Sequence, residues 1–487
     1  MKFWAKIGVG LLVVVALVVA VMLGRAGCVE STQPAGGEGV EIDVDGGEDK
    51  LQRLSQAIQF ETISPRKAGD EEPFESMHQW LEEVFPKVHD RADRRLQGGL
   101  TPHYMLEGSQ EGAPHVLFLA HMDVVPIDEG TEEDWAHPPF SGAMEDGYIW
   151  GRGTLDNKQS MMAILEAMEA RLEQGWTPEH TIHLVFGHDE EIGGMEGARG
   201  VAEWMVDEGI ELQAVYDEGL TITEGVVPGV EAPVALIGIT EKGYLSVELR
   251  ATAQGGHASM PPEELAVYRL MDALSVLQAD GAEPRIDGPA AKMFEWLAPE
   301  MGWGHRLIFR NLWLLEPLAV WQMGQAPTTR AVLQTTAAPT VLRAGDADNV
   351  LPQSARAVIN FRLHPRDDIE GWMERLESIW DEPYLSVEPV GDMRSEPGPL
   401  ARMEGKGYEA LETALMEVFP DVVVAPNMLV AAADGRHFTD LTADVYRFQP
   451  LVLDGDEIGR IHGTNERITK VNYLALIAYY DRLLAHW

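Results

Sequence analysis

The stretch HVLFLAHMDVVP, residues 115–126, predicts both the architecture of the chain and the place of a functional site. Its first six residues, 115–120, form a short apolar run, which is typical of a strand buried on both faces of a parallel sheet. His121 and Asp123 follow at once. Ligands of α/β proteins gather at the carboxyl ends of strands. We therefore expect these two side chains at a functional edge of the sheet.

Segments of the same kind continue along the chain and alternate in type. Strands separated by helices predict a mostly parallel sheet with helices on both faces, an α/β fold. Apolar spacing predicts helices at 51–60, 74–84, 160–172 and 197–206, and strands at 115–120, 181–186 and 214–216.

The pattern changes near residue 240. Residues 244–251 (YLSVELRA) and 355–363 (ARAVINFRL) alternate polar and apolar side chains, as half-exposed antiparallel strands do. After residue 407 the α/β pattern returns. The simplest topology is a catalytic domain in two parts, interrupted by an inserted α+β lid domain. We expect these domains at residues 50–239, 391–487 and 240–390, in that order.

Composition narrows the function. The 487 residues are 45 % hydrophobic and 24 % charged, which indicates a folded chain of two or three domains. The net charge of −42 opposes binding to nucleic acid. The single cysteine, Cys28, excludes an intramolecular disulfide and a cysteine zinc finger. A metal in this chain must be held by histidine, aspartate and glutamate.

The N-terminus predicts a place at a membrane. Lys2 and Lys6 precede an apolar run of 17 residues, 7–23, at the lower limit for a membrane-spanning helix. Residues 1–29 are interpreted as a signal anchor that leaves the catalytic domain outside the cytoplasm, periplasmic or extracellular. The alternatives are a cleaved signal peptide with secretion, and lipidation at Cys28. Residues 30–49, rich in Gly, Glu and Asp, predict a solvated linker.

Further polar side chains follow at intervals that suit successive βα units. Asp156 lies in GRGTLDNK (151–158), where a helix cap is the competing interpretation. Glu190 and Glu191 follow the strand in FGHDEEIGG (186–194), where a solvated acidic loop is the alternative. Asp217 follows the next strand, in YDEG. His121, Asp156, Glu191 and Asp217 are separated along the chain by 35, 35 and 26 residues.

With His462 of GRIHGTNE, the set contains two histidines and three carboxylates. Two zinc ions that share a bridging carboxylate require such a set. The cofactor expected is two Zn²⁺ per chain, with Co²⁺ or Mn²⁺ as alternatives.

At this point the chain resembles the zinc exopeptidases that include carboxypeptidase S, aminoacylase, bacterial glutamate carboxypeptidase and succinyl-diaminopimelate desuccinylase. The similarity covers nearly all of residues 50–487. Within the family it is strongest to the branch of carboxypeptidase S and N-fatty-acyl-amino-acid synthase/hydrolase. The segments that carry it are AHMDVVP, WAHPPFSG, GRGTLDNKQS, GHDEEIGG, YDEG, GGHAS, NVLP and RIHGTNE.

The resemblance implies roles for the catalytic residues. Asp156 would bridge both metals, and the peptide bond between Asp156 and Asn157 would be cis. His121 and Asp217 would complete one site, and Glu191 and His462 the other. Glu190 would be the general base, while Asp123 would orient His121.

The resemblance also implies roles at and beyond the lid. His257 of GGHAS would stabilise the oxyanion, and Asn349 of NVLP would bind substrate. Arg436 of AADGRHF would pair with the free carboxylate of the substrate, although AADGR departs from the commoner family form. Lids of the family often mediate homodimers, and the long insert at 274–325 is expected to replace or to block that contact.

The reaction expected is hydrolysis of the amide bond next to a C-terminal amino acid, as in a carboxypeptidase acting on small peptides. The alternative is an N-acyl amino acid hydrolase or synthase. The Trp- and Leu-rich stretch 294–321 would then line an acyl pocket rather than form lid core. A non-catalytic binding protein is the remote alternative. Aminopeptidase action lacks an assignable acidic residue for a free amine.

Overall fold

A computed structural model describes residues 2–28, 30–65, 67, 69–391 and 393–487. Its centre is an eight-stranded sheet in the order β1-β2-β6-β3-β7-β16-β8-β15. The strands of this sheet are β1 (Asp93–Gln97), β2 (Thr101–Leu106), β3 (His115–His121), β6 (Ile182–Gly187), β7 (Leu212–Thr223), β8 (Val234–Glu241), β15 (Val423–Leu429) and β16 (Val445–Leu453).

The middle of this sheet is parallel. β6, β3, β7 and β16 run in one direction, whereas β1, β2 and the β16–β8 pair add antiparallel neighbours. The expected α/β fold with a mostly parallel sheet is confirmed. The antiparallel strands at one edge arise because β1 and β2 are joined by a short hairpin.

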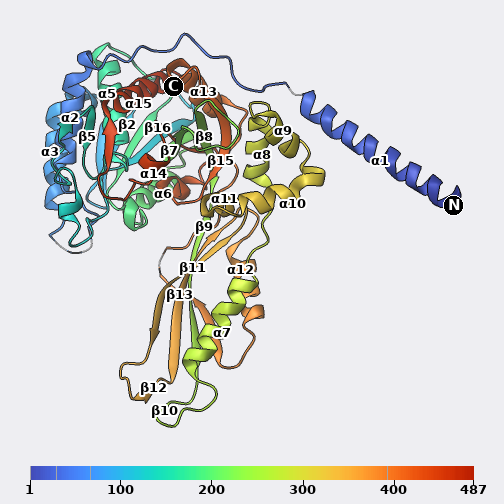
Figure 1. Ribbon diagram of the computed structural model, residues 1–487. Helices are drawn as coiled ribbons and strands as arrows, with labels where there is room; N and C mark the ends of the chain where they lie inside the picture. Colours follow the sequence, from blue (N-terminus) through green and yellow to red (C-terminus); the bar gives the residue numbers. More distant parts are fainter. Residues whose placement is uncertain (1, 29, 66, 68, 392) are drawn as a thin grey trace.

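Helices cover both faces of the sheet (Figure 1). Side chains of β3 alternate between two cores, with Val116 and Phe118 on one side and Leu117 and Leu119 on the other. The smaller core is covered by α6 (Ala198–Asp207). The larger core is covered by α2 (Glu48–Ile58), α3 (Glu72–Val84), α4 (Pro86–Arg91), α5 (Lys158–Glu173), α13 (Lys406–Val418) and α15 (Lys470–Leu484).

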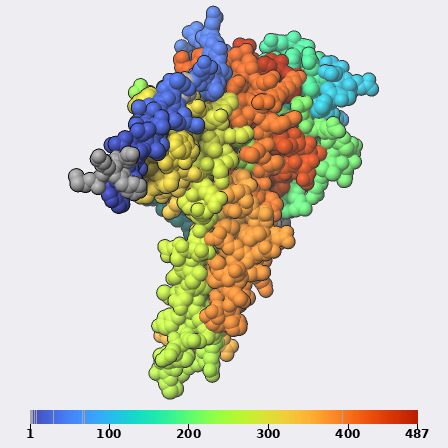
Figure 2. Space-filling model, turned by 90° about the vertical axis from the view of Figure 1, so that its right-hand side faces the viewer, coloured from blue at the N-terminus to red at the C-terminus, as the bar shows by residue number. Residues whose placement is uncertain are grey.

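The inserted segment forms an elongated lid that projects from the catalytic body (Figures 1 and 2). Its sheet has the order β11-β13-β9-β14, and a short β10–β12 pair lies at its tip. One face of the sheet packs on two helices in a core of its own. The elements are β9 (Gly243–Thr252), β10 (Gly256–His257), α7 (Ala266–Ala279), β11 (Thr336–Ala344), β12 (Val350–Leu351), β13 (Ser354–Leu363), α12 (Ile369–Ile379) and β14 (Leu385–Pro389).

A second insertion lies within the lid sequence but packs elsewhere. Its helices are α8 (Gly288–Leu297), α9 (Trp303–Phe309), α10 (Leu312–Met323) and α11 (Pro327–Ala331). They return to the catalytic body, where Phe294 and Leu297 join a core with Val423 and Ala425 of edge strand β15. The stretch 294–321 therefore builds neither the core of the lid sheet nor the lining of the catalytic pocket.

The N-terminal segment is the long helix α1 (Lys2–Gly27), which leads away from the body (Figure 1). Among the described residues, one stretch, Val9–Gly27, is long and apolar enough to cross a membrane. The linker that follows lies against the catalytic domain. Val40 and Ile42 pack on the larger core, and the Gln33 side chain bonds to the backbone of Val424.

Candidate metal centre

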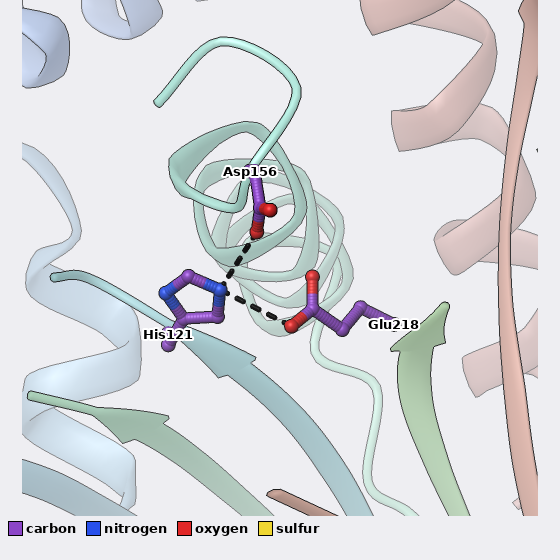
Figure 3. Close-up of side chains that lie close together, drawn as sticks. All are labelled: His121, Asp156 and Glu218. Carbon is purple, nitrogen blue, oxygen red and sulfur yellow. Dashed lines mark hydrogen bonds and ion pairs between the residues drawn. The ribbon is translucent and has the colours of Figure 1, made fainter. Parts of the chain in front are cut away.

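The carboxyl end of β3 and the loop before α5 bring His121 and Asp156 together (Figure 3). His121 ends β3, and Asp156 lies in the loop before α5. The His121 Nε2 atom is 2.9 Å from Asp156 Oδ1 and 3.1 Å from Glu218 Oε1. These three side chains are close enough to bind one metal ion.

A second group shares the other oxygen of Asp156. His462 Nε2 lies 2.9 Å from Asp156 Oδ2 and 3.1 Å from Glu191 Oε1. Glu191 lies in the short helix η3 (Glu190–Ile192), directly after β6, and His462 follows α14 (Gly455–Ile458). Asp156 thus presents one oxygen to each group, which is the arrangement of a bridging carboxylate. The peptide bond from Asp156 to Asn157 is cis.

The structure places Glu218, and not Asp217, in the first group. Asp217 is buried, and its Oδ2 accepts a hydrogen bond of 2.6 Å from Gly435 N. Its Oδ1 accepts one of 2.8 Å from Glu218 N. Glu218 points to the opposite side of β7, where its Oε2 accepts a hydrogen bond of 2.6 Å from Asn157 Nδ2. Asp217 accepts hydrogen bonds from the backbone, and Glu218 lies with His121 and Asp156. The assignment of Asp217 as a ligand stays a prediction, and Glu218 is the candidate that the geometry adds.

Asp123 is fully buried and connects the two sides of the site. The Nδ1 of His121 is 2.9 Å from the backbone oxygen of Asp123 and 3.3 Å from its carboxylate. That carboxylate also accepts hydrogen bonds from the backbone N–H groups of Glu190 and Glu191, each at 3.2 Å, and from Ser64 Oγ at 2.7 Å. Asp123 therefore fixes the ring of His121 and the turn that carries both glutamates.

Carboxylates dominate the electrostatics among the candidate ligands. Burial, together with the negative charge of the neighbouring Asp156, raises the pKa of Glu218 to about 8. Hydrogen bonds to Asp156 and Glu191 raise the pKa of His462 to about 10. Burial alone would lower the pKa of His121, but the carboxylates around it raise it well above its usual value. A metal cation would keep these clustered carboxylates ionised, and the imidazole and carboxylate donors present fit two divalent metal ions.

Glu190 stands beside this set as a candidate proton acceptor. It lines the same pocket as Asp156 and Glu191. Burial raises the pKa of its carboxyl well above the usual value. A carboxylate whose pKa is brought towards neutrality is suited to take up and return a proton.

The pocket also contains two guanidinium groups. Arg436 donates to the backbone oxygen of Gly193 at 2.8 Å and faces the pocket near Glu190. Arg362, at the end of lid strand β13, lines the same pocket, and its buried Nη1 has no hydrogen-bond partner within the described part of the chain. Sequence reasoning missed Arg362, because in an alternating strand each arginine reads as solvent-facing.

His257 and Asn349 are brought together, but not at the metal centre. His257 ends β10 and Asn349 directly precedes β12 at the far tip of the lid (Figure 1), where Ala258 N donates to Asn349 O at 3.1 Å. His257 is exposed and accepts a hydrogen bond of 3.1 Å from Ser259 N. The structure therefore leaves the predicted roles of these two residues as predictions.

Comparisons with known proteins agree with this geometry. The sequence profile described as "Peptidase family M20/M25/M40" matches residues 117–486. "Probable carboxypeptidase S-like 2" of Dictyostelium discoideum is 37 % identical over 442 residues, covering 89 % of this chain and 84 % of the relative. "N-fatty-acyl-amino acid synthase/hydrolase PM20D1.1" of Danio rerio is 38 % identical, covering 89 % and 85 %.

Similarity of fold extends to solved structures. An M20 family metallo-carboxypeptidase from Sulfolobus solfataricus superimposes with a TM-score of 0.67 at 19 % identity, covering 90 % of this chain and 98 % of the other. Human carnosine dipeptidase 1 superimposes with a TM-score of 0.62 at 15 % identity, covering 91 % and 97 %.

Proposed function

The chain belongs to peptidase family M20/M25/M40 and is a metallopeptidase-type enzyme, and from this we propose that it is a di-zinc carboxypeptidase. It would cleave the amide bond next to a C-terminal amino acid with a free carboxylate. The single observation that carries the proposal is Asp156, whose two oxygens each face one histidine at 2.9 Å.

Zinc is proposed because the donors are two imidazoles with carboxylates, a set typical of hydrolytic zinc sites. His121 and Glu218 would hold one ion, Glu191 and His462 the other, and Asp156 would bridge them. When bound, the metals would lower the pKa of a water molecule and polarise the scissile carbonyl.

The side chains of the pocket would perform the proton transfers. Glu190 would accept a proton from the attacking water and return it to the departing amine. Asp123 would hold the Glu190 backbone and the ring of His121 in fixed positions relative to each other, because it is hydrogen-bonded to both. The guanidinium groups of Arg436 and Arg362 would bind the free carboxylate, which both can reach from the pocket wall.

The second candidate function is hydrolysis or synthesis of N-acyl amino acids. It is favoured by the relatives named for N-fatty-acyl-amino acids, which are 33–38 % identical to this chain. The two functions share the free carboxylate and the metal chemistry. They differ only in the group on the acyl side of the amide bond.

The lid tip would complete the site. His257 would supply a hydrogen bond to the oxyanion and Asn349 a contact to substrate. In the structure both lie at the end of the lid remote from the catalytic body (Figure 1), so either closure of the lid or a lid from a second copy would have to deliver them. The exposed edge strand β11 is available for pairing between two lids in a homodimer.

We further propose that α1 anchors the enzyme in the cell membrane, with the catalytic domain outside the cytoplasm. Its apolar stretch of 19 residues would span about 28 Å as a helix, close to the hydrocarbon thickness of a bilayer. The lysines at its start would remain on the cytoplasmic side. Secretion after signal cleavage is the alternative.

The test is hydrolysis by the zinc-loaded full chain of two substrate panels. The first contains blocked dipeptides with free carboxylates, and the second contains long-chain N-acyl amino acids. Faster release from the dipeptides supports the carboxypeptidase, and faster release from the acyl compounds supports the second candidate. If neither panel is hydrolysed, and Glu190→Gln equals the parent enzyme, the hydrolase proposal is wrong.

A further inference from the structure

The face of α9 and α10 that points away from the catalytic body is apolar. A surface helix of a soluble domain normally turns a polar face outward. α10, with the sequence LWLLEPLAVWQM, carries no charged residue except Glu316. The large apolar side chains exposed on α9 and α10 are Trp303, Trp313, Leu314, Leu318 and Trp321.

These exposed side chains stand on a rigid base. The opposite side of α10, through Ala319 and Met323, is buried in the core shared with β15. Beneath α9, the rings of Phe294 and Phe309 stack at 3.9 Å between centroids. The outward face is therefore held in place while it remains uncovered.

The α9–α10 face lies beside the final turns of α1. Asn311, between the two helices, donates a hydrogen bond of 3.1 Å to Met22 O, and Arg25 Nε donates one of 2.9 Å to Arg310 O. Met22 is five residues before the end of α1, about 7 Å along the helix axis. The connection between α9 and α10 thus reaches back alongside the apolar segment of α1.

Composition at this face suits the region between water and lipid. The Nε1 of Trp313 donates to Asn311 Oδ1 at 3.2 Å, so the polar edge of its ring is satisfied while the ring stays exposed. Tryptophan concentrates at membrane interfaces for this reason. The whole chain has a net charge of −42, but the segment from α9 to α10, including Arg310, contains two arginines and only one glutamate. This segment is therefore not acidic like the rest of the chain.

We propose that the α9–α10 face docks on the lipid bilayer in which α1 is embedded, and holds the catalytic body at the membrane surface. The occupant is the bilayer because the face is continuous with the membrane-spanning candidate through the hydrogen bonds that Asn311 makes to Met22 and Arg25 makes to Arg310. Figure 1 shows α9 and α10 on the side of the body from which α1 leads away, and Figure 2 shows α1 in front of the insert. The inference rests on the membrane placement of α1 proposed above.

The test uses the full chain with Cys28→Ser, so that one introduced cysteine carries an environment-sensitive fluorophore. The test sites are Trp313→Cys and Trp321→Cys, whose parent side chains are 55 % and 65 % exposed. Val206→Cys on α6, also 55 % exposed in the parent, is the matched control. Leu17→Cys reports on α1. Each protein is reconstituted into phosphatidylcholine vesicles with and without brominated acyl chains.

The expected result is blue-shifted emission and roughly two-fold or greater quenching by brominated lipid at 313, 321 and 17, but not at 206. Quenching at 17 alone would overturn the docking and leave the anchor intact. No quenching at 17 would overturn both. A blue shift at 313 and 321 without lipid quenching would assign the face to a protein contact and also overturn the proposal. Unfolding temperatures equal to the Cys28→Ser parent show that each variant is folded.

Discussion

Glu466 and Arg152 form a fully buried ion pair, 2.5 Å apart, that ties two loops of the metal centre together. Glu466 Oε1 also accepts hydrogen bonds from the backbone of the loop leading to Asp156, at 3.0 Å from Gly153 and 2.8 Å from Leu155. Arg152 in turn donates to the backbone oxygen of His462 at 3.1 Å. One buried ion pair thus positions two candidate metal ligands, Asp156 and His462.

Replacing Glu466 with glutamine should destabilise the protein strongly. The change keeps the shape but leaves the Arg152 charge buried without its partner, which costs about 3 kcal/mol or more. Urea unfolding measures this loss. Glu203→Gln, which breaks the exposed pair with Arg199, is the control and should cost less than about 0.5 kcal/mol. Equal losses in the two variants would contradict the positioning role.

Substitutions of the neighbouring carboxylates Asp217 and Glu218 should have different effects, one on stability and the other on metal binding. Glu218→Gln removes a candidate ligand, so zinc content should fall from two towards one per chain. Asp217→Asn weakens the hydrogen bond from Gly435 and should lower the unfolding temperature while both metals remain. Metal analysis after gel filtration distinguishes them. Loss of zinc from Asp217→Asn alone would restore the original ligand assignment.

This pair also shows where sequence reasoning stops. The apolar runs suffice to place His121 and Glu191 after neighbouring strands β3 and β6, whereas Asp156 follows no strand of the central sheet and lies in the loop before α5. Spacing along the chain is therefore only a partial guide. The residue gaps do not decide between adjacent carboxylates, because side chains alternate along a strand. The pairing of β7 with β16 shifts register directly after Asp217. Arg447 pairs with Asp217, whereas the next residue, Phe448, pairs with Leu220. Such an irregularity is set by tertiary packing and leaves no local pattern.

Glu190→Gln should abolish turnover while leaving the metals bound. The amide cannot accept a proton, so kcat should fall by about 10³-fold. The measurement is steady-state kinetics together with zinc content. Glu196→Gln, an exposed change in the same loop, should retain the parent rate. A Glu190→Gln enzyme with more than a tenth of the parent rate would exclude Glu190 as the base.

Arg362→Gln should weaken recognition of the substrate carboxylate. Charged hydrogen bonds of this kind contribute about 2–3 kcal/mol, so kcat/KM should fall by about 10²-fold. The same variant should not change hydrolysis of a substrate amidated at its C-terminus. Arg250→Gln on the exposed side of β9 is the matched control. A loss that is equal for free and amidated substrates would show a structural role.

The buried histidines of β2 and β6 should make the protein sensitive to acid. His103 Nε2 and His183 Nδ1 are 2.8 Å apart, and burial lowers the pKa of His103 to about 4. The unfolded chain takes up this proton near pH 6.5, so it binds more protons than the native state between pH 6.5 and 4. Stability should therefore fall as the pH drops through that window.

For His103 alone this loss amounts to about 3 kcal/mol. His103→Gln should remove that part of the pH dependence, and His257→Gln, at the exposed lid tip, should not. The measurement is urea unfolding of the full chain at pH 7 and pH 4.5. Identical pH dependence in parent and His103→Gln would exclude the effect.

The insert marks a second limit of sequence reasoning. Residues 274–325 lie between lid elements, so sequence position assigns them to the lid. The first part of this stretch, to Ala282, does pack in the lid core, but the apolar side chains of α8 and α10 pack on β15 instead. The alternation within β9 and β13, in contrast, is readable directly, since each strand buries one face.

That covering of β15 has a consequence for solubility. An open strand edge invites pairing with another chain, and an enzyme confined to a membrane meets its own copies at high local concentration. Here Gln33 accepts from Val424 N at 2.6 Å and donates to Val424 O at 3.0 Å. The side chain occupies backbone groups that a foreign strand would use. The linker and the insert therefore protect the sheet from intermolecular β-pairing, a protection that suits the membrane placement proposed for this chain.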